Sequence, residues 1–455
     1  MLYPVLQDPL RPVVGSLFDR PVGVNIRQML FGAGEQGGWY DVADMSTLFQ
    51  DSAGATPVTA VEQQVGRMLD KSGRGNHATQ VTATKRPVYS RRVNLLTKTD
   101  SLSNLAWSTA GVSVSGNRVT ASSTNAIHIL YQVFPYVPNQ SVCYRIQVAK
   151  KVGFGFFQLC YSNVQRIKCT LNLDTGEYEV SSIGGASAVV TVTDTGTGRF
   201  EVTITGTNAA AIVPGYFNCG LTTALSGVPT NPYDEPTFMG NGEYMDLYEP
   251  DIRLAIDAHL PYQWVNTATD YDADPSKFPA YLRFDGVDDA LQTANIDFTG
   301  TDKMTVWAGV TKLSDAATSI FLESSNDTNS NHGAFYITAP EQPGASSFAF
   351  KSRGSLDLNP VDLYGNAAPI SRVVAAIGDI GGDIATIRAG GASVTGTEDQ
   401  GAGNHGNYPL YIGARAGTSL YFNGRLYSLI VRGAQTPLSQ IQTVESYIKQ
   451  KMRLP

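Results

Sequence analysis

The sequence predicts an all-β protein built from two antiparallel β-sandwiches, with a short helix at the C-terminus and an extended arm at the N-terminus. Most of the 455 residues form short runs of β-branched and aromatic types, separated by Gly, Asp, Asn or Ser. Only 16% of the residues are charged, which is too few for the exposed faces of a helical rod or a coiled coil. The 42% of hydrophobic residues suffices for more than one buried core, and the length corresponds to two or three domains.

The N-terminal arm is expected over residues 1–35. Pro4, Pro9, Pro12 and Pro21 forbid a long helix and cannot donate hydrogen bonds to a sheet. The apolar residues between them would hardly stay exposed to water in a free tail. We therefore expect the arm to dock onto a partner or, as an equally good alternative, to pack on its own domain. The contact residues expected in the first case are Tyr3, Val5, Leu6, Leu10, Leu17 and Phe18.

Two sets of predicted strands follow the arm. The first set has the pattern of an antiparallel sandwich, and its runs cover residues 141–150, 167–174, 176–183, 188–196 and 198–206. The second set covers residues 303–313, 333–338, 347–352, 372–379, 384–390, 410–415, 419–422 and 425–433. Asn423 and Gly424 stand between the last two runs. Because both residues tolerate the positive φ of a type I′ turn, they predict a hairpin there.

A C-terminal helix is predicted from the spacing of apolar residues. Thr436 can cap this helix, and Pro437 suits its first turn. Basic residues near its end complement the negative pole of the helix dipole. The apolar positions are Leu438, Ile441, Val444, Ile448 and Met452, and the basic ones are Lys449, Lys451 and Arg453.

The charge and the hydropathy pattern exclude several classes of partner. With 33 basic and 40 acidic residues the formal net charge is −7, which argues against binding to nucleic acid or anionic lipid. No apolar run approaches the roughly 20 residues that span a bilayer. The first 15 residues lack both a basic segment and a continuous apolar stretch, so they do not resemble a secretory signal. We expect the chain to fold in a cytoplasm.

The four cysteines are Cys143, Cys160, Cys169 and Cys219. They form no CxxC pair and have no histidine at zinc-ligand spacing, so we expect reduced and mostly buried thiols. A disulfide remains an alternative.

Two separated motifs resemble a known family. Residues 39–80 read WYDVADMSTLFQDSAGATPVTAVEQQVGRMLDKSGRGNHATQ, and residues 281–291 read YLRFDGVDDAL. Both resemble the concanavalin A-like, or laminin G-like, lectin/glucanase sandwich as it occurs in bacteriophage virion proteins. The final segment 410–433, LYIGARAGTSLYFNGRLYSLIVRG, and the helix after it are similar to that family's last hairpin and tail helix.

The distance between the two motifs departs from the family pattern and suggests an inserted domain. The family usually places them a few tens of residues apart, whereas here about 200 residues separate Gln80 from Tyr281. Residues 94–107 resemble the start of the carbohydrate-binding-module-like jelly rolls of phage tail proteins, and residues 242–274 resemble the end of such a module. We therefore expect a discontinuous concanavalin A-like sandwich over residues 36–92 and 266–455. A jelly roll over residues 93–265 would be inserted in one of its surface loops.

Several common catalytic patterns are absent or incomplete. Residues 32–37 match G-x-G-x-x-G, but the helix that would hold a pyrophosphate does not follow. The sequence has no phosphate-binding G-x-x-x-x-G-K-[ST] loop, no H-E-x-x-H zinc helix and no G-x-S-x-G nucleophile elbow. Catalytic members of the lectin-like fold carry an E-x-D-x-E strand, with all three carboxylates on one face. The nearest string here places Glu243 and Glu249 on one face and Asp246 on the other. We expect no enzymatic activity.

Acidic residues in one turn could offer oxygen ligands to calcium. Asp285, Asp288 and Asp289 lie in this turn, and Asp70 and Asn76 in another loop could complete a site. The favoured interpretation is that these carboxylates accept backbone hydrogen bonds in turns, and Arg74 would repel a cation. The five histidines are scattered. The sequence therefore predicts neither a metal site nor a cofactor.

Aromatic residues are the remaining candidates for binding, because sugar rings stack on exposed aromatic faces. The candidates within the inserted module are Trp107, Tyr131, Tyr136, Tyr161, Tyr216 and Tyr244, although the default expectation for each is packing in the core or at its rim.

The resemblance to virion proteins, together with the missing catalytic patterns, implies a non-catalytic structural protein of a phage virion, assembled in the host cytoplasm. The favoured role is a tail-associated or fibre-like adhesin that binds a host surface glycan. A capsid decoration or head-fibre protein and a glycan depolymerase are the alternatives. The expected partners are other virion subunits, host carbohydrate and further copies of the chain in a symmetric oligomer, with a trimer favoured.

Overall fold

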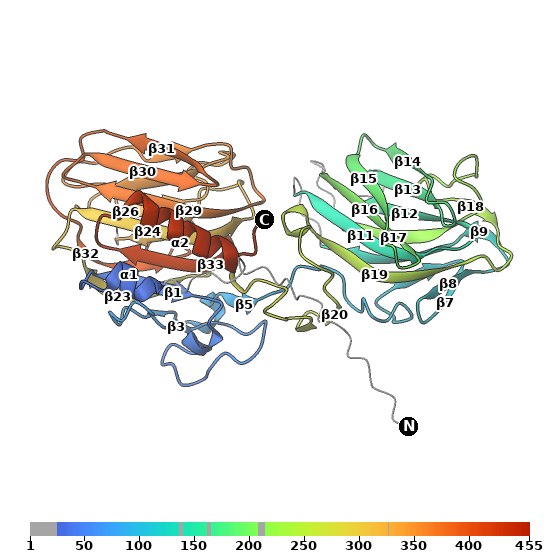
Figure 1. Ribbon diagram of the computed structural model, residues 1–455, viewed down its shortest axis with the longest axis horizontal. Coiled ribbons are helices and arrows are strands. Elements are labelled where there is room, and N and C mark those ends of the chain that lie inside the picture. Colours follow the sequence, from blue (N-terminus) through green and yellow to red (C-terminus); the bar gives the residue numbers. More distant parts are fainter. Residues whose placement is uncertain (1–24, 136–139, 162–164, 208–213, 326) are drawn as a thin grey trace, which may run out of the picture.

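The computed structural model describes residues 25–135, 140–161, 165–207, 214–325 and 327–455. Two bodies of β-structure lie side by side (Figure 1). Almost all regular structure consists of antiparallel strands, so the predicted all-β class is confirmed. The described part of the chain contains no helix that is long and apolar enough to cross a membrane.

The first sandwich combines strands from the two ends of the sequence. One sheet has the order β31-β30-β29-β24-β33-β22-β5, and β1 also pairs with β33. The strands of this sheet are β1 (Gly37–Asp41), β5 (Val88–Ser90), β22 (Tyr281–Asp285), β24 (Lys303–Lys312), β29 (Ile370–Asp379), β30 (Ile384–Ala389), β31 (Ala392–Gly396) and β33 (Asn423–Arg432).

The second sheet of this sandwich has the order β2-β3-β4-β23-β32-β25-β26-β27-β28. Its strands are β2 (Leu48–Phe49), β3 (Arg67–Met68), β4 (Ala78–Thr79), β23 (Leu291–Asp297), β25 (Ile320–Ser324), β26 (Phe335–Thr338), β27 (Phe348–Ser352), β28 (Val361–Leu363) and β32 (Asn407–Ile412). The alternation of side chains along the strands places Val306, Phe321, Phe335 and Leu429 in the core between the two sheets.

The two motifs that are distant in sequence meet in this sandwich. β33 pairs with β24 along one side, and on its other side β1 and β22 follow each other end to end. Trp39 lies opposite Ile430, and Phe284 lies opposite Gly424. The Gln80 side-chain amide also donates to the Ala290 carbonyl at 2.8 Å.

The second sandwich consists of residues between these two motifs. One sheet has the order β14-β13-β12-β17-β10-β6 and the other has the order β15-β16-β11-β19-β8-β7. The strands of the first are β6 (Ser108–Ala110), β10 (Ile129–Phe134), β12 (Phe154–Cys160), β13 (Arg166–Asn172), β14 (Tyr178–Ile183) and β17 (Gly215–Thr222). Those of the second are β7 (Val112–Ser115), β8 (Arg118–Ala121), β11 (Val142–Ala149), β15 (Ser187–Asp194), β16 (Arg199–Thr207) and β19 (Tyr244–Leu254).

A separate core fills this second sandwich, and it includes Leu130, Tyr144, Phe157, Phe217 and Ile252. Two small ribbons complete the β-structure: β9 (Asn125–Ile127) with β18 (Thr237–Met239), and β20 (Val265–Thr267) with β21 (Asp270–Tyr271). That each sandwich folds by itself remains a prediction.

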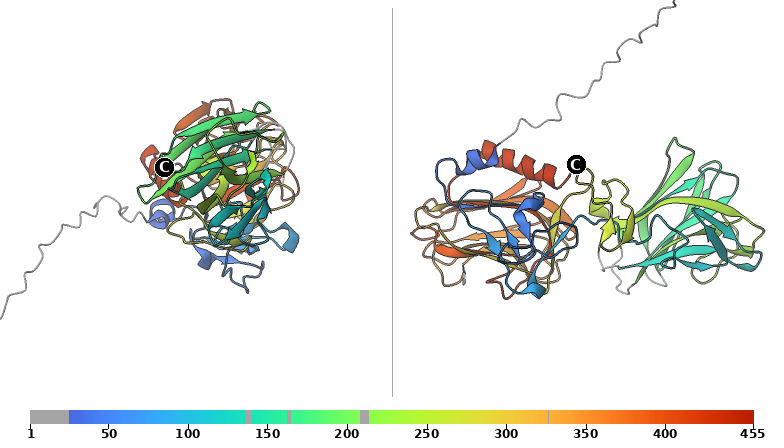
Figure 2. Two further views of the ribbon diagram at one scale, coloured as in Figure 1. Left: turned by 90° about the vertical axis from the view of Figure 1, so that its right-hand side faces the viewer. Right: turned by 90° about the horizontal axis from the view of Figure 1, so that it is seen from below.

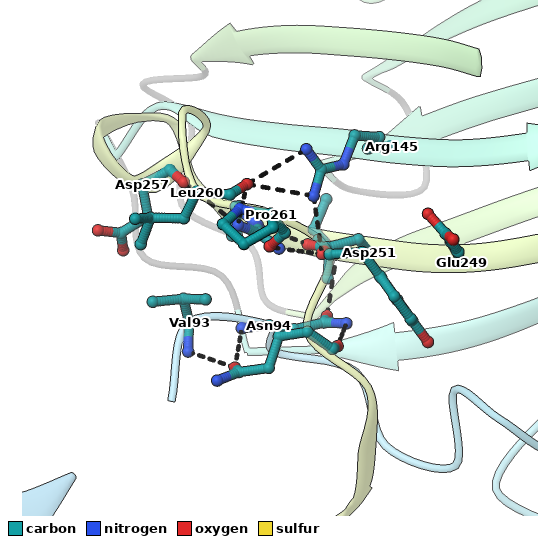
Figure 3. A network of polar contacts seen from close by, with 12 residues as sticks. Val93, Asn94, Arg145, Glu249, Asp251, Asp257, Leu260 and Pro261 are labelled. Carbon is teal, nitrogen blue, oxygen red and sulfur yellow. Dashed lines mark hydrogen bonds and ion pairs between the residues drawn. The ribbon is translucent and has the colours of Figure 1, made fainter. Parts of the chain in front are cut away.

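The two chain crossings between the sandwiches lie next to each other and are tied by a buried polar network (Figure 3). The Gln263 side-chain oxygen accepts from the backbone N–H groups of Val93 and Asn94, at 2.7 and 3.1 Å. The Asn94 amide donates back to the Gln263 carbonyl at 2.9 Å. A short 3₁₀ turn at Ala255–Asp257 then places Asp257 2.8 Å from Arg425 of β33, and both side chains are buried.

The prediction of an extended arm over residues 1–35 is wrong for residues 26–31, which form a helix. Helix α1 (Ile26–Phe31) forms because no proline follows Pro21 in this stretch and because Asn25 accepts from the Gln28 N–H at its start. Leu30 and Phe31 join helix α2 (Leu438–Lys451) in one apolar cluster on the outer face of the eight-stranded sheet (Figure 2). The predicted docking residues Tyr3, Val5, Leu6, Leu10, Leu17 and Phe18 lie outside the described residues.

The C-terminal helix is present, but its predicted cap is wrong. Pro437, not Thr436, occupies the N-cap position. The Thr436 hydroxyl instead accepts from Arg432 at 2.8 Å and donates to Thr305 at 3.1 Å, because the preceding strand holds it against the sheet. Leu438 is 55% exposed, so the apolar stripe begins at Ile441.

The predicted Asn423-Gly424 turn is also wrong. Both residues belong to β33, opposite Asp285 and Phe284 of β22. The chain reverses earlier, around Ala416 and Gly417, which have positive φ. Gly424 is required for packing: a Cβ there would lie 2.3 Å from the Thr311 carbonyl oxygen and from the Phe422 ring. Close approach of neighbouring strands, rather than a turn, accounts for this glycine.

Candidate functional site

Trp264 differs from the other tryptophans in its exposure. Trp39, Trp107 and Trp307 are at most 9% exposed, whereas Trp264 is 39% exposed. It lies in the segment that returns from the second sandwich to the first, just before β20. An indole ring presents a large apolar face and one N–H donor, so partial exposure makes it available to a ligand.

Trp264 lines a groove of about 450 Å³ beside the sheet that contains β19. We call this the Trp264 groove, and define it by residues of five segments. They are Thr99, Asp100 and Leu102; Asn117; Arg199 of β16; Leu247, Tyr248 and Glu249 of β19; and Tyr262 and Trp264. Aromatic rings, two carboxylates, an amide and a guanidinium therefore share one concave surface.

A row of side chains across three strands fixes the polar part of the groove. The Arg199 guanidinium stacks on the Tyr248 ring, 3.6 Å from its centroid. Arg199 also donates to the Gln147 side-chain oxygen at 3.3 Å, and the Gln147 amide donates to Glu249 at 3.0 Å. The row holds a positive and a negative group in set positions without pairing them directly.

Glu249 occupies a strained position in a β-bulge. In the antiparallel register of β11 and β19, Arg145 lies opposite Asp251 and Gln147 lies opposite Tyr248. Glu249 and Pro250 together therefore lie opposite a single residue of β11. The φ of Glu249 is +53°, a conformation that non-glycine residues rarely adopt. Bulges and strained residues concentrate at functional sites, where they redirect a side chain.

The junction between the sandwiches supports this bulge from below (Figure 3). The Asn94 amide donates to the Pro250 carbonyl at 3.1 Å, and its oxygen accepts from the Ile252 N–H at 3.2 Å. Asp251 is fully buried and pairs with Arg253 and Arg145. The strained backbone is thus held by a satisfied network.

The electrostatic environment of Glu249 combines burial with nearby positive charges. Burial raises the pKa of Glu249, and the positive charges of Arg145 and Arg199 oppose that shift in part. On the aromatic side, the Tyr262 hydroxyl donates to the Thr99 hydroxyl at 2.8 Å. The Thr99 N–H donates in turn to the Val265 carbonyl at 2.9 Å. These bonds fix the Tyr262 ring and the backbone beside Trp264.

The structure places two of the sequence-predicted aromatic residues in the core. Trp107 is 5% exposed, its ring N–H donates to the Lys98 carbonyl at 2.9 Å, and it packs edge-on against Phe217. Tyr161 is fully buried in the same core. Because both rings are covered, neither of these two predictions can describe a sugar-stacking residue.

Three further candidates lie nearer the surface. The half-buried Tyr244 ring is covered by two cations, Arg118 at 4.0 Å and Lys151 at 3.9 Å. Tyr131 and Tyr216 are half-buried neighbours on β10 and β17, with ring centroids 6.3 Å apart. The structure does not bring either one to the Trp264 groove, and Tyr136 lies outside the described residues.

The three carboxylates considered for glycosidase chemistry have separate environments. Glu243 accepts from the Asn241 N–H at 2.7 Å, Asp246 pairs with Arg118, and Glu249 belongs to the groove. The bulge, which sequence alone does not reveal, gives Glu249 its special setting.

The acidic turn has the hydrogen bonds expected of a turn. Asp285 accepts from the N–H groups of Val287 and Asp288, and Asp289 accepts from the Asp285 N–H. The three carboxylates of Asp285, Asp288 and Asp289 lie within 4.8 Å of one another. Burial and the Asp285 charge raise the pKa of Asp289 to about 7.

Asp70 and Asn76 serve their own loop. Asp70 accepts from the N–H groups of Trp39, Ser72 and Asn76. Arg74 donates to the carbonyls of Glu35 and Phe31, which ties this loop to the end of helix α1. The loop is therefore stabilised by contacts within the protein.

Sequence reasoning missed Trp264 because the segment around it has the composition of a linker. Tyr262 and Trp264 stand only two residues apart in PYQW. Two large aromatic residues in a short connecting segment were the available signal, since such a segment has little core of its own to bury them.

No protein-family model matches the chain, and no curated protein matches its sequence. Among solved structures, the CBM40 of Ruminococcus gnavus IT-sialidase, bound to α2,3-sialyllactose, is 15% identical. That match covers 32% of this chain and 83% of the other, with a TM-score of 0.26. Domains LG4-5 of the mouse laminin α1 chain are 11% identical over 70% of this chain and 89% of the other, with a TM-score of 0.28.

A third similar structure is Trypanosoma rangeli sialidase in complex with sialic acid. It is 11% identical, and the match covers 86% of this chain and 62% of the other, with a TM-score of 0.30. Likenesses at this level identify neither a family nor an activity.

Proposed function

We propose that this protein binds carbohydrate in the Trp264 groove without cleaving it. The observation that carries the proposal is the exposed Trp264 ring on the wall of a groove that also holds Arg199 and Glu249. The aromatic face would stack on the C–H groups of a sugar ring. The fixed polar groups would hydrogen-bond the hydroxyls, a combination that suits a ligand with one apolar and one polar aspect.

The charges of the groove favour a neutral, hydroxyl-rich ligand over a polyanion. Asp100 and Glu249 supply two carboxylates, and Arg199, which already stacks on Tyr248, supplies one positive charge. A polyanion would meet repulsion from the carboxylates, whereas sugar hydroxyls can both donate to them and accept from Arg199.

The biological setting that we propose is a phage virion, with the chain as a tail-associated or fibre-like adhesin for a host surface glycan. The support is the resemblance of residues 39–80 and 281–291 to lectin-like sandwiches of virion proteins. The N-terminal arm would attach the chain to other virion subunits, and the sandwiches would face outward. A capsid decoration or head-fibre protein is the alternative within the same class.

One observation favours a second candidate function, a glycan depolymerase. Glu249 has a raised pKa and shares the groove with Asp100. Glycosidases pair a carboxylic acid of raised pKa with a second carboxylate across the scissile bond. Release of reducing ends by the intact protein, abolished by Glu249→Gln, would support this candidate.

The decisive experiment compares the intact chain with Trp264→Ala on a glycan array, followed by titration of any sugar that binds. Loss of a central aromatic contact should cost about 2 kcal/mol, which is roughly a thirtyfold weaker affinity. Tyr364→Ala is the matched control, because Tyr364 is 66% exposed and lies in the first sandwich, outside the groove. Equal binding by the intact chain and Trp264→Ala would reject the groove as the site. No binding and no cleavage would favour the decoration role.

A further inference from the structure

The longest sheet edge in the described structure is strand β15. The other described strands that pair on one side only have two to six residues: β1, β2, β5, β6, β7, β9, β14, β18, β20, β21, β28 and β31. β15 has eight, and its register with β16 runs without a shift from Ser187–Thr207 to Asp194–Phe200. An edge of this length presents a row of backbone N–H and C=O groups to any strand that approaches.

β15 lacks the devices that usually protect a long edge. Residues 187–193, SAVVTVT, contain no charged residue and no proline, and the regular register excludes a bulge. Val189 is 68% exposed on this strand. Next to it, at the same end of the sandwich, β14 forms the edge of the facing sheet with Tyr178 40% and Val180 50% exposed (Figure 1). Apolar side chains therefore accompany the open backbone edge.

We infer that β15 pairs antiparallel with β15 of a second copy of this chain about a twofold axis. The order of apolar and small polar side chains along the strand is self-complementary around Val190. In that register Ala188 lies opposite Val192 of the other copy, and Val189 lies opposite Thr191. Ser187 then faces Thr193, and no charged residue falls within the seven paired positions.

The same register preserves the two faces of the sheet. Ala188, Val190 and Val192 are partly buried and pack on the core of the second sandwich, whereas Val189, Thr191 and Thr193 point to solvent. Pairing around Val190 matches inward with inward and outward with outward side chains, as an antiparallel ladder requires. Two six-stranded sheets would become one continuous sheet, and an isologous contact of this kind closes at two subunits.

Light scattering on the full chain at micromolar concentration tests this inference independently of any sugar. We expect twice the chain mass of 48.8 kDa. A monomer would overturn the inference, and so would the trimer that the sequence favours, because one antiparallel edge pair joins only two copies.

Two double variants test the register. Val189→Lys with Thr191→Lys places lysines opposite each other and should give a monomer, whereas Val189→Lys with Thr191→Glu places opposite charges together and should keep the dimer. The control Val152→Lys changes a valine that is 81% exposed outside any strand and should leave the dimer intact. Circular dichroism checks that each variant is folded. A dimer in the double-lysine variant, or a monomer in the lysine–glutamate variant, would overturn the pairing.

Discussion

The buried ion pair between the two sandwiches allows a quantitative test of how closely they are joined. Arg425 of β33 donates to Asp257 at 2.8 Å, and the two side chains are 8% and 5% exposed. Arg425 also lies 4.7 Å from the centroid of the Tyr281 ring. Replacing Asp257 by Ala removes the counter-charge but leaves the second sandwich over the guanidinium.

The expected cost follows from burial. An arginine that loses its partner while it stays covered destabilises a protein by about 3–5 kcal/mol. Asp257→Ala should therefore lower the free energy of unfolding of the first sandwich by roughly that amount. Adding Arg425→Met should recover most of the loss, because an apolar side chain of similar length then fills the site.

Urea unfolding followed by tryptophan fluorescence measures this effect, since Trp39 and Trp307 both pack on the first sandwich. The deletion of residues 95–262, with a short Gly/Ser linker between Asn94 and Gln263, supplies the contrast. That variant also lacks Asp257, but the second sandwich no longer covers Arg425, so the guanidinium is open to water. We therefore expect the first sandwich to unfold there without the free-energy cost of an unpaired buried charge. If Asp257→Ala changes the free energy of unfolding by less than about 1 kcal/mol, the guanidinium is solvated in the intact chain and the junction is not closed as described.

Further predictions concern independent folding, packing, pH and attachment. The deletion of residues 95–262 should leave a domain that unfolds in one cooperative transition. If that variant is unfolded while residues 266–455 fold alone, the hypothesis of an inserted domain is wrong. Gly424→Ala should destabilise by about 1–3 kcal/mol because its Cβ meets the Thr311 carbonyl, while Gly300→Ala, with open space around it, should have little effect in the same urea experiment. Burial lowers the pKa of His405 from 6.5 to about 4, so the unfolded chain binds a proton more readily than the folded chain. The free energy of unfolding should therefore fall by roughly 3 kcal/mol as the pH drops from 6.5 to 4. The dependence on pH should be shallower in His405→Asn. Deleting residues 2–24, which spares helix α1, should leave circular dichroism and sugar binding unchanged but abolish incorporation into particles; normal incorporation would move the attachment to a face of a sandwich.

The sequence by itself determined the fold class and the approximate position of most strands. Short runs rich in β-branched residues, such as 141–150 and 372–379, became β11 and β29, because the preference of these residue types for extended backbone is local. The apolar spacing of the C-terminal helix was equally readable. The buried state of Cys160 and Cys169 also agrees with expectation, and burial raises the pKa of both thiols to about 12.

The tertiary structure alone decided the turn chemistry and the site. Asn423 and Gly424 have the local preference for a hairpin, yet the approach of β22 and β24 on either side of β33 makes them part of a strand. Trp264 becomes a candidate binding residue only because it is exposed and lies in the same groove as Glu249. Glu249 in turn lines the groove from a β-bulge between strands that are distant in sequence. Local patterns record the conformational preference of a short segment. Exposure and convergence depend on contacts between residues far apart in the chain, and no short segment contains that information.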